Sequence, residues 1–222
     1  MNFKCIFRGN ILIGALEESI RRHVLSPNNN RPFVAVELGT YCGYSSILMG
    51  KAMYKAKQQF TSFNCHLFTT EIHREYYEIA TEMIQLTNGM DGMISVHQTT
   101  FDGHDTDMVN VIRSAIEERN HSPQSKVELD FLFIDHDKDS YKSDLCKLEE
   151  SGMITAGTKI VADNVLFANI EEYVSYVQQR MKEGIVETRT VKCTVEYSGD
   201  DKDNNEDGVE ITDYLQDPSS AN

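Results

Sequence analysis

Runs of apolar residues typical of strands alternate with segments of helical periodicity along most of this 222-residue chain. The strand-like runs are short and rich in apolar residues, as expected of strands buried on both faces. In the first helical segment Leu12, Leu16 and Ile20 fall on one face, with charged residues opposite. The predicted strands are residues 33–39, 65–72, 94–99, 129–136 and 158–164, and the predicted helices are residues 10–25, 44–57, 74–87, 106–119, 141–151 and 170–181.

This alternation predicts an α/β domain with a mainly parallel sheet. Near the C-terminus, residues 188–197 and 209–214 alternate in polarity like the arms of a hairpin, which we expect to add antiparallel strands at one edge. The predicted fold is a mainly parallel seven-stranded sheet with an antiparallel C-terminal hairpin and helices on both faces. We expect residues 1–222 to form one domain, with a mobile acidic loop at 200–207 and a mobile tail at 217–222.

The composition indicates a cytoplasmic protein that binds neither nucleic acid nor membranes. A net charge of −14 argues against both partners, because they attract clustered Lys and Arg. Five cysteines without metal-ligand or redox spacing indicate reduced thiols. Residues 11–16 are apolar, but charged residues follow at once, so they fit an amphipathic helix better than a signal peptide. No run approaches the ~20 apolar residues of a membrane span.

The first predicted strand leads into a turn with two glycines, Gly39 and Gly43, and then into a helix. Bare backbone in such a turn can approach a small molecule, and the unpaired N–H groups of the helix N-terminus face it. The spacing is Gly-x-x-x-Gly, not the Gly-x-Gly-x-x-Gly of dinucleotide folds, so a nicotinamide or flavin cofactor is not indicated. Ligands of parallel sheets bind beyond the carboxyl ends of the strands. The residues expected there are Gly39, Glu71, Asp135, Asp163 and Asn164.

Two kinds of chemistry suit these strand ends. Glu71 ends the second strand, where an acid can accept hydrogen bonds from the hydroxyls of a ribose; a solvated strand-end acid is the alternative. Asp135, Asp163 and Asn164 offer two carboxylates and an amide oxygen, which are ligands suited to Mg²⁺. In the alternative interpretation, Asp163 and Asn164 cap a turn and Asp135 is an ordinary strand-end acid.

Lys138 lies three residues after Asp135, on the loop that leaves the same strand. A dication or a sulfonium close to this lysine would favour its neutral form, which can act as a general base. The alternative is a solvated surface lysine.

A series of short motifs extends over most of the chain, from about residue 9 to residue 215. The motifs are Glu-Leu-Gly-Thr-Tyr-Cys-Gly-Tyr-Ser at 37–45, Thr-Glu-Ile at 70–72, Ile-Asp-His-Asp-Lys-Asp-Ser-Tyr at 134–141, Leu-Glu-Glu-Ser-Gly at 148–152, Ala-Asp-Asn-Val at 162–165, Val-Glu-Tyr at 195–197 and Asp-Gly-Val-Glu at 207–210. In order and spacing they resemble the catechol O-methyltransferase family. The combination is far more specific than any one motif.

The resemblance implies a Rossmann-like methyltransferase that uses S-adenosylmethionine and Mg²⁺. Asp135, Asp163 and Asn164 would bind the metal ion. Lys138 would be the general base, and Glu196 would hold the second hydroxyl of the acceptor. The residues implied to contact the cofactor are Gly39, Tyr41, Ser45, Glu71, Asp102, Asp135 and His136, and those implied to contact the substrate are Asp135, Lys138, Asn164 and Glu196.

The implied reaction is methyl transfer to one hydroxyl of a catechol-type small molecule. The apolar slot for the acceptor differs from the family: Asp137 replaces an aromatic residue, Ala168 replaces the usual Pro, and the chain contains no Trp. We also expect the two helices that the family places before the segment matching Gly9 to be missing. Because apolar walls hold a flat ring, cofactor, metal and reaction type are indicated more firmly than the acceptor. Another phenolic acceptor, or a non-catalytic protein that binds the cofactor or a partner, are the alternatives.

Overall fold

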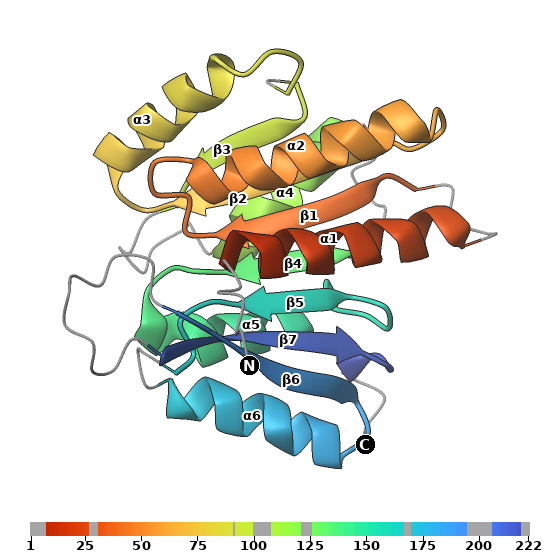
Figure 1. Cartoon of the computed structure of the whole chain (residues 1–222), viewed down its shortest axis with the longest axis vertical. Coiled ribbons are helices and arrows are strands. Elements are labelled where there is room, and N and C mark those ends of the chain that lie inside the picture. The colour runs from red at the N-terminus through yellow and green to blue at the C-terminus, as the bar shows by residue number, and fades with distance from the viewer. Residues whose placement is uncertain are drawn as a thin grey trace, which may run out of the picture.

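The computed structural model describes residues 8–26, 31–90, 92–99, 108–120, 126–166, 170–194 and 206–218. Within these ranges the chain forms a seven-stranded sheet of order β3-β2-β1-β4-β5-β7-β6 (Figure 1). β1 to β5 pair in parallel, and β7 runs antiparallel to β5 and β6. The strands are β1 (Phe33–Leu38), β2 (Cys65–Glu71), β3 (Ile94–Gln98), β4 (Phe131–Ile134), β5 (Lys159–Ala162), β6 (Val186–Thr194) and β7 (Glu206–Tyr214).

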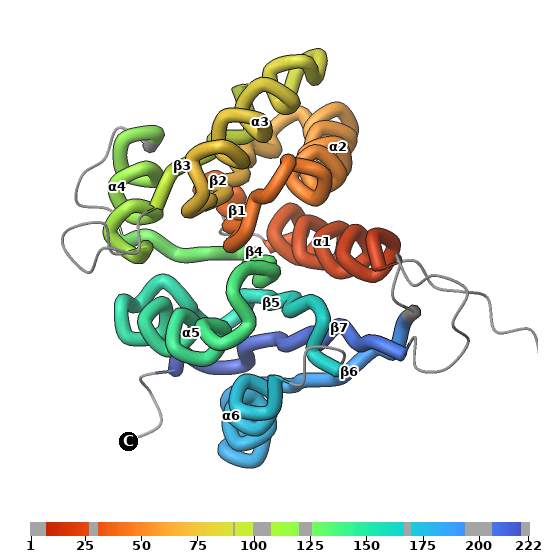
Figure 2. The backbone as a smooth tube through the Cα atoms, turned by 90° about the vertical axis from the view of Figure 1, so that its left-hand side faces the viewer, coloured from red at the N-terminus to blue at the C-terminus, as the bar shows by residue number. Residues whose placement is uncertain are grey.

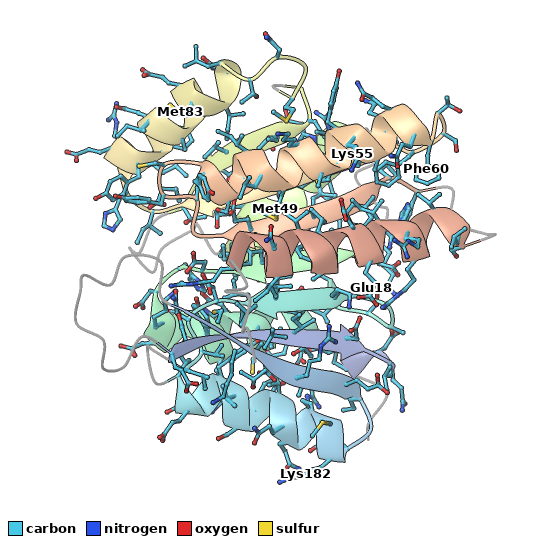
Figure 3. The ribbon with its side chains drawn as sticks, viewed as in Figure 1. Glu18, Met49, Lys55, Phe60, Met83 and Lys182 are labelled. Atoms are coloured by element: carbon cyan, nitrogen blue, oxygen red, sulfur yellow. The ribbon has the colours of Figure 1, made fainter. Side chains whose placement is uncertain are left out.

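Helices cover both faces of this sheet (Figure 2). One face packs against α1 (Arg8–Leu25), α2 (Tyr44–Gln59) and α3 (Arg74–Gln85), and the other against α4 (Met108–Asn120), α5 (Tyr141–Glu150) and α6 (Glu171–Lys182). Met49 of α2 is fully buried in the core between α2 and α1 (Figure 3). None of the described helices has the length and apolar character needed to cross a membrane.

A hydrophobic core lies on each face of the sheet, and successive residues of a central strand point into one core or the other. Val34, Val36 and Leu38 of β1 face the core below α4, α5 and α6, whereas Phe33 and Ala35 face the core below α1 and α2. This division follows from the two-residue period of a strand, and it explains why these strands are mostly apolar on both faces.

The predicted fold is confirmed, with element boundaries that differ by a few residues. The acidic loop expected at 200–207 is wrong at its C-terminal end, where Glu206 and Asp207 already belong to β7. Asp207 is fully buried because its carboxylate accepts hydrogen bonds from the amide of Asn164 at 2.8 Å and the backbone N–H of Gly208 at 2.7 Å. Residues 200–205 and 219–222 lie outside the described residues.

Strand register brings the carboxyl ends of the parallel strands to one level. Leu38 pairs with Thr70 of β2 and with Ile134 of β4, and Ile134 pairs with Ala162 of β5. The residues that follow these four positions in the chain are Gly39, Glu71, Asp135 and Asp163.

α1 runs antiparallel to the parallel strands. Its first residue, Arg8, contacts Asp163 just after β5, whereas His23 near its end contacts Asp130 just before β4. The helix therefore places its N-terminus at the edge of the sheet where the predicted site lies.

Candidate active site

The glycine turn after β1 packs directly against the chain that leaves β4. Gly39 has a φ of 98°, which residues with a side chain rarely adopt. A Cβ atom here would lie 2.5 Å from the carbonyl oxygen of Asp135. The N–H groups of Gly39 and Thr40 both donate to the carbonyl oxygen of Thr70, each at 3.1 Å. Only glycine permits this turn and its close approach to Asp135.

Glu71 holds the other side of the turn. Its carboxylate accepts hydrogen bonds from the backbone N–H groups of Tyr41 at 2.8 Å and His73 at 2.9 Å. Glu71 is buried rather than solvated. Tyr41 has a φ of 48° and an exposed ring that packs on Tyr76, with ring centroids 4.6 Å apart. A left-handed residue with a large side chain is strained, and such strain concentrates at ligand sites.

Glu37 is a fully buried acid beneath the start of α2 that the predicted site does not include. Its carboxylate accepts hydrogen bonds from the hydroxyls of Ser45, Ser46 and Thr69. Burial raises the pKa of Glu37 to about 7, although these three hydroxyls oppose the rise. Its signal in the sequence is an acid inside an otherwise apolar strand. Ser45, expected at the cofactor, is oriented by this acid.

Two short contacts anchor Lys138 at the end of β4. Its Nζ atom donates to Oδ1 of Asp135 and to the hydroxyl of Tyr141, each at 2.7 Å. The Tyr141 hydroxyl in turn donates to the backbone carbonyl of Asp163 at 3.2 Å. These contacts form because a 3-10 turn, Lys138–Ser140, leads directly into α5 at Tyr141. The side chain of Lys138 is 31% exposed, so Nζ is positioned by the protein and still open to a ligand.

Asp163 and Asn164 form a strained turn after β5. Asn164 has a φ of 60°, and its backbone N–H donates to Oδ1 of Asp163 at 2.8 Å. Asp163 therefore caps this turn, as the alternative interpretation of the sequence expects. The turn also takes part in ion pairs. Arg8 lies 3.2 Å from Oδ2 of Asp163 and 3.5 Å from Oδ2 of Asp207. Burial and the negative charge of Asp135 raise the pKa of Asp163 to about 6, although Arg8 opposes the rise.

The donor set at these two strand ends fits a hard divalent cation. Asp135 and Asp163 supply carboxylates, and the Asn164 amide nitrogen is taken by Asp207, which leaves the amide oxygen as a ligand. Over the ranges that the structure describes, no three His, Cys, Asp or Glu side chains are grouped for a metal ion. An ion here would have two carboxylates and one amide as protein ligands, which suits Mg²⁺ rather than zinc.

His136 lies beside this donor set. Its Nε2 atom is 2.9 Å from Oδ2 of Asp144, and its ring stacks on Tyr141 with an interplanar angle of 8°. Its Nδ1 atom is buried and has no hydrogen-bond partner among the described residues. This orphaned nitrogen is available to a polar ligand atom.

The structure brings the predicted residues that it describes to one edge of the sheet. Asp102 and Glu196 lie outside the described residues. The roles of all the predicted site residues remain predictions. The residues at this edge that sequence reasoning missed are Arg8, Glu37, Tyr141 and Asp207. Tyr141 had a local signal, because it closes the motif that contains Lys138. Arg8 had none, because it comes from the start of the chain. Asp207 opens the motif at 207–210, but nothing in the sequence placed it beside Asn164.

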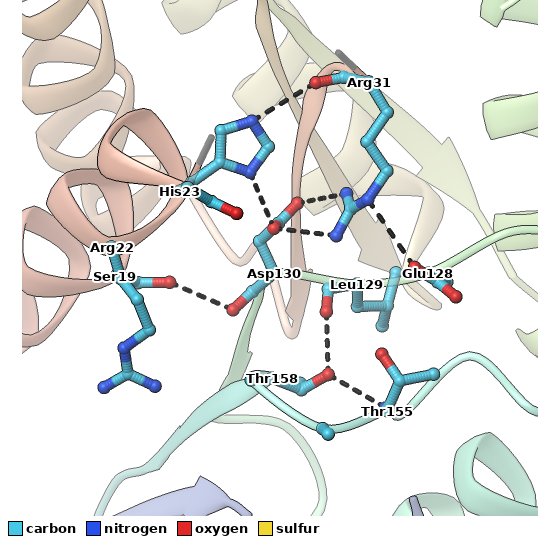
Figure 4. Close-up of a pocket in the computed structure, with 12 residues that line it drawn as sticks. Ser19, Arg22, His23, Arg31, Glu128, Leu129, Asp130, Thr155 and Thr158 are labelled. Atoms are coloured by element: carbon cyan, nitrogen blue, oxygen red, sulfur yellow. Dashed lines mark hydrogen bonds and ion pairs between the residues drawn. The ribbon is translucent and has the colours of Figure 1, made fainter. Parts of the chain in front are cut away.

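A separate cavity of about 160 Å³ lies at the opposite edge, near the amino ends of β4 and β5 (Figure 4). Asp130 lines it and accepts hydrogen bonds from Arg31, at 2.6 and 2.9 Å, and from the backbone N–H of Val34 at 2.8 Å. His23 of α1 lies 2.9 Å from the same carboxylate. These groups satisfy one another, so we interpret this network as a structural anchor for α1.

Comparison with known proteins identifies relatives of this arrangement. A family model described as O-methyltransferase matches residues 30–190. The catechol O-methyltransferase of Bos taurus is 28% identical over 148 residues, which cover 67% of this chain and 47% of that protein. The catechol O-methyltransferase of Mus musculus is 29% identical, with 67% and 48% covered. The matches thus span about half the length of these curated relatives.

Solved structures of methyltransferases share the fold. The O-methyltransferase TomG from Streptomyces achromogenes, in complex with SAM, superposes with a TM-score of 0.58 at 16% identity and covers 91% of this chain and 80% of its own. The SAH-bound Podospora anserina methyltransferase PaMTH1 gives a TM-score of 0.55 at 14% identity, with 96% and 90% covered.

Proposed function

Because this chain belongs to the O-methyltransferase family, we propose that it transfers a methyl group from S-adenosylmethionine to one hydroxyl of a catechol-type small molecule. The observation that carries this proposal is the placement of Lys138. Its Nζ atom is held 2.7 Å from Asp135, in the same row of strand ends as Asp163 and Asn164. That row combines a candidate base with ligands for an ion that binds two adjacent hydroxyls.

The glycine turn and its neighbours would hold S-adenosylmethionine, which supplies an electrophilic methyl group when bound. Glu71, fixed by two backbone N–H groups, would accept hydrogen bonds from the ribose hydroxyls. The unpaired Nδ1 atom of His136 would face the adenine. The other residues proposed to contact the cofactor are Gly39, Tyr41, Ser45, Asp102 and Asp135.

Asp135, Asp163 and Asn164 would hold Mg²⁺, which would orient two adjacent hydroxyls of the acceptor and make them more acidic when bound. Asp135 and Asn164 thereby also border the substrate. Glu196 is proposed to hold the second hydroxyl.

Lys138 would act as the general base. In its neutral form Nζ accepts the proton of the nearer acceptor hydroxyl, and the oxygen then forms a bond to the methyl carbon as the carbon–sulfur bond breaks. Tyr141 and Asp135 hold Nζ in place for this transfer. The protein contributes mainly by positioning, an effect worth up to ~7–11 kcal/mol in favourable intramolecular cases.

A methyltransferase for another phenolic acceptor is the second candidate. Asp137 is exposed at the position where the resemblance implies an aromatic wall, and it accepts a hydrogen bond from Ser140 at 2.9 Å. A carboxylate at this wall would suit an acceptor with a larger, polar substituent.

The test is a methyl-transfer assay on the full chain with S-adenosylmethionine. The acceptors are a panel of catechols and matched monophenols, with Mg²⁺ or with EDTA. We expect methylated catechols only with Mg²⁺, and a loss of about 10²–10⁴-fold in kcat for Lys138→Met. Lys142→Met is the matched control, because Lys142 lies close by in α5 and pairs with Glu172 on the surface. Binding of S-adenosylmethionine without transfer to any vicinal diol would support a non-catalytic cofactor-binding protein instead.

A further inference from the structure

The first residue of α1 places a guanidinium group directly behind the proposed metal ligands. Arg8 Nη1 lies 3.2 Å from Oδ2 of Asp163 and 3.5 Å from Oδ2 of Asp207. The Arg8 side chain is only 15% exposed. Its Nε atom is buried without a hydrogen-bond partner among the described residues. Arg8 is thus held mainly by the charges of the two carboxylates.

The positive side chains at this edge already pair with the carboxylates that would bind the metal ion. Lys138 is in contact with Asp135, and Arg8 is shared between Asp163 and Asp207. A divalent cation on Asp163 would place a second positive charge next to the carboxylate that Arg8 already neutralises. Two positive charges that share one carboxylate repel each other strongly where burial lowers the effective dielectric.

We propose that Arg8 is a built-in competitor for the divalent cation, so that metal binding at Asp135, Asp163 and Asn164 opposes the docking of the first turn of α1. This inference rests on the metal ligands of the proposed function. It concerns only the binding of the ion, and turnover is not needed to test it.

The rest of α1 has other contacts with the protein that do not depend on the ion pairs of Arg8. A second arginine of the same helix, Arg22, pairs with Asp213 at 2.9 Å. Asp213 lies on β7, as Asp207 does, but at the end of the strand far from the metal ligands. At the same end, His23 lies 2.9 Å from Asp130. Release of Arg8 would therefore loosen only the start of α1, and Arg22 provides a matched control.

The test is a titration of the full chain with MnCl₂, a spectroscopic substitute for Mg²⁺, with free Mn²⁺ measured by electron paramagnetic resonance. No cofactor or acceptor is added. We expect Arg8→Gln to bind Mn²⁺ about tenfold more tightly than wild type, within the range of coupling found between sites in proteins. Arg8→Lys, which keeps the charge, and Arg22→Gln should stay close to wild type.

Hydrogen–deuterium exchange gives a second measurement. Mg²⁺ should speed amide exchange in the first turn of α1 in wild type, because it weakens the only ion pairs of that turn with the sheet that the described residues show. The same region of Arg8→Gln should exchange fast with or without Mg²⁺. Thermal unfolding of each variant confirms that it is folded.

Unchanged or weaker Mn²⁺ binding by Arg8→Gln would overturn the inference, and weaker binding would mark Arg8 as a support that orients Asp163. Absence of Mn²⁺ binding in both wild type and Arg8→Gln would overturn it together with the metal ligands. If Arg8→Gln binds Mn²⁺ more tightly but no acceptor is methylated, the inference stands and the proposed activity fails.

Discussion

The hydroxyl of Tyr141 connects the proposed base to the neighbouring strand end, because it accepts a hydrogen bond from Nζ of Lys138 at 2.7 Å and donates one to the carbonyl of Asp163 at 3.2 Å. Tyr141→Phe removes both contacts and keeps the ring that stacks on His136. We expect kcat to fall about tenfold with little change in KM, because the base loses its position. Stability should fall by about 1 kcal/mol.

Steady-state kinetics and urea unfolding measure both effects. Tyr173→Phe is the matched control, since Tyr173 packs edge-on against Tyr141, whereas the hydrogen bonds of Lys138 among the described residues go to Asp135 and Tyr141. Equal kinetics for Tyr141→Phe and wild type would show that Asp135 alone positions Nζ.

Glu71 is expected to bind the ribose through a carboxylate that two backbone N–H groups already hold. In Glu71→Gln one acceptor oxygen becomes an amide NH₂, which would face a backbone donor. We expect stability to fall by about 1–2 kcal/mol. Affinity for S-adenosylhomocysteine should fall by about tenfold, which corresponds to ~1.4 kcal/mol. Calorimetric titration measures the binding, and Glu75→Gln on the exposed start of α3 is the control. Unaltered binding would remove Glu71 from the cofactor site.

Glu37 should make stability depend on pH. Burial raises its pKa from an ordinary 4.5 to about 7, so the folded protein favours the protonated acid. The stabilisation from this group is complete below about pH 4.5 and is lost as pH rises through about 7. Glu37→Gln keeps a neutral side chain at every pH. Relative to this variant, wild type should lose on the order of 2–3 kcal/mol between pH 5 and pH 8. Urea unfolding across this range measures the difference, and parallel profiles would contradict it.

Asp130 should matter for stability but not for activity. Its carboxylate accepts hydrogen bonds from Arg31 and Val34 and contacts His23, at the edge of the sheet opposite to the candidate site (Figure 4). Asp130→Asn removes the nearer of the two carboxylates that face Arg31 and leaves Glu128, and we expect a loss of about 1–3 kcal/mol. Methyl transfer per folded molecule should be unchanged.

The control for this prediction is Glu128→Gln. Glu128 lies 3.6 Å from Nε of Arg31, and its side chain is 26% exposed. Removal of this partly exposed charge should cost less than about 1 kcal/mol. A loss of activity in folded Asp130→Asn would show that α1 transmits changes between the two edges.

The sequence by itself determined the fold and most of the candidate site. Apolar strands that alternate with amphipathic helices allow little besides a parallel sheet, and in such a sheet residues that follow the strands share one edge. Gly39, Glu71, Asp135 and Asp163 could therefore be placed together from their positions alone. Lys138 could be added because it lies one short turn after Asp135.

Only the tertiary structure decided how those residues are held and charged. Arg8 and Asp163 are separated by 155 residues, and Asn164 and Asp207 by 43. Such pairs have no local periodicity, because they depend on the antiparallel entry of β7 and on the direction of α1. The ion pair between Arg8 and Asp163 therefore exists only in the folded chain, where burial strengthens the interaction between its charges.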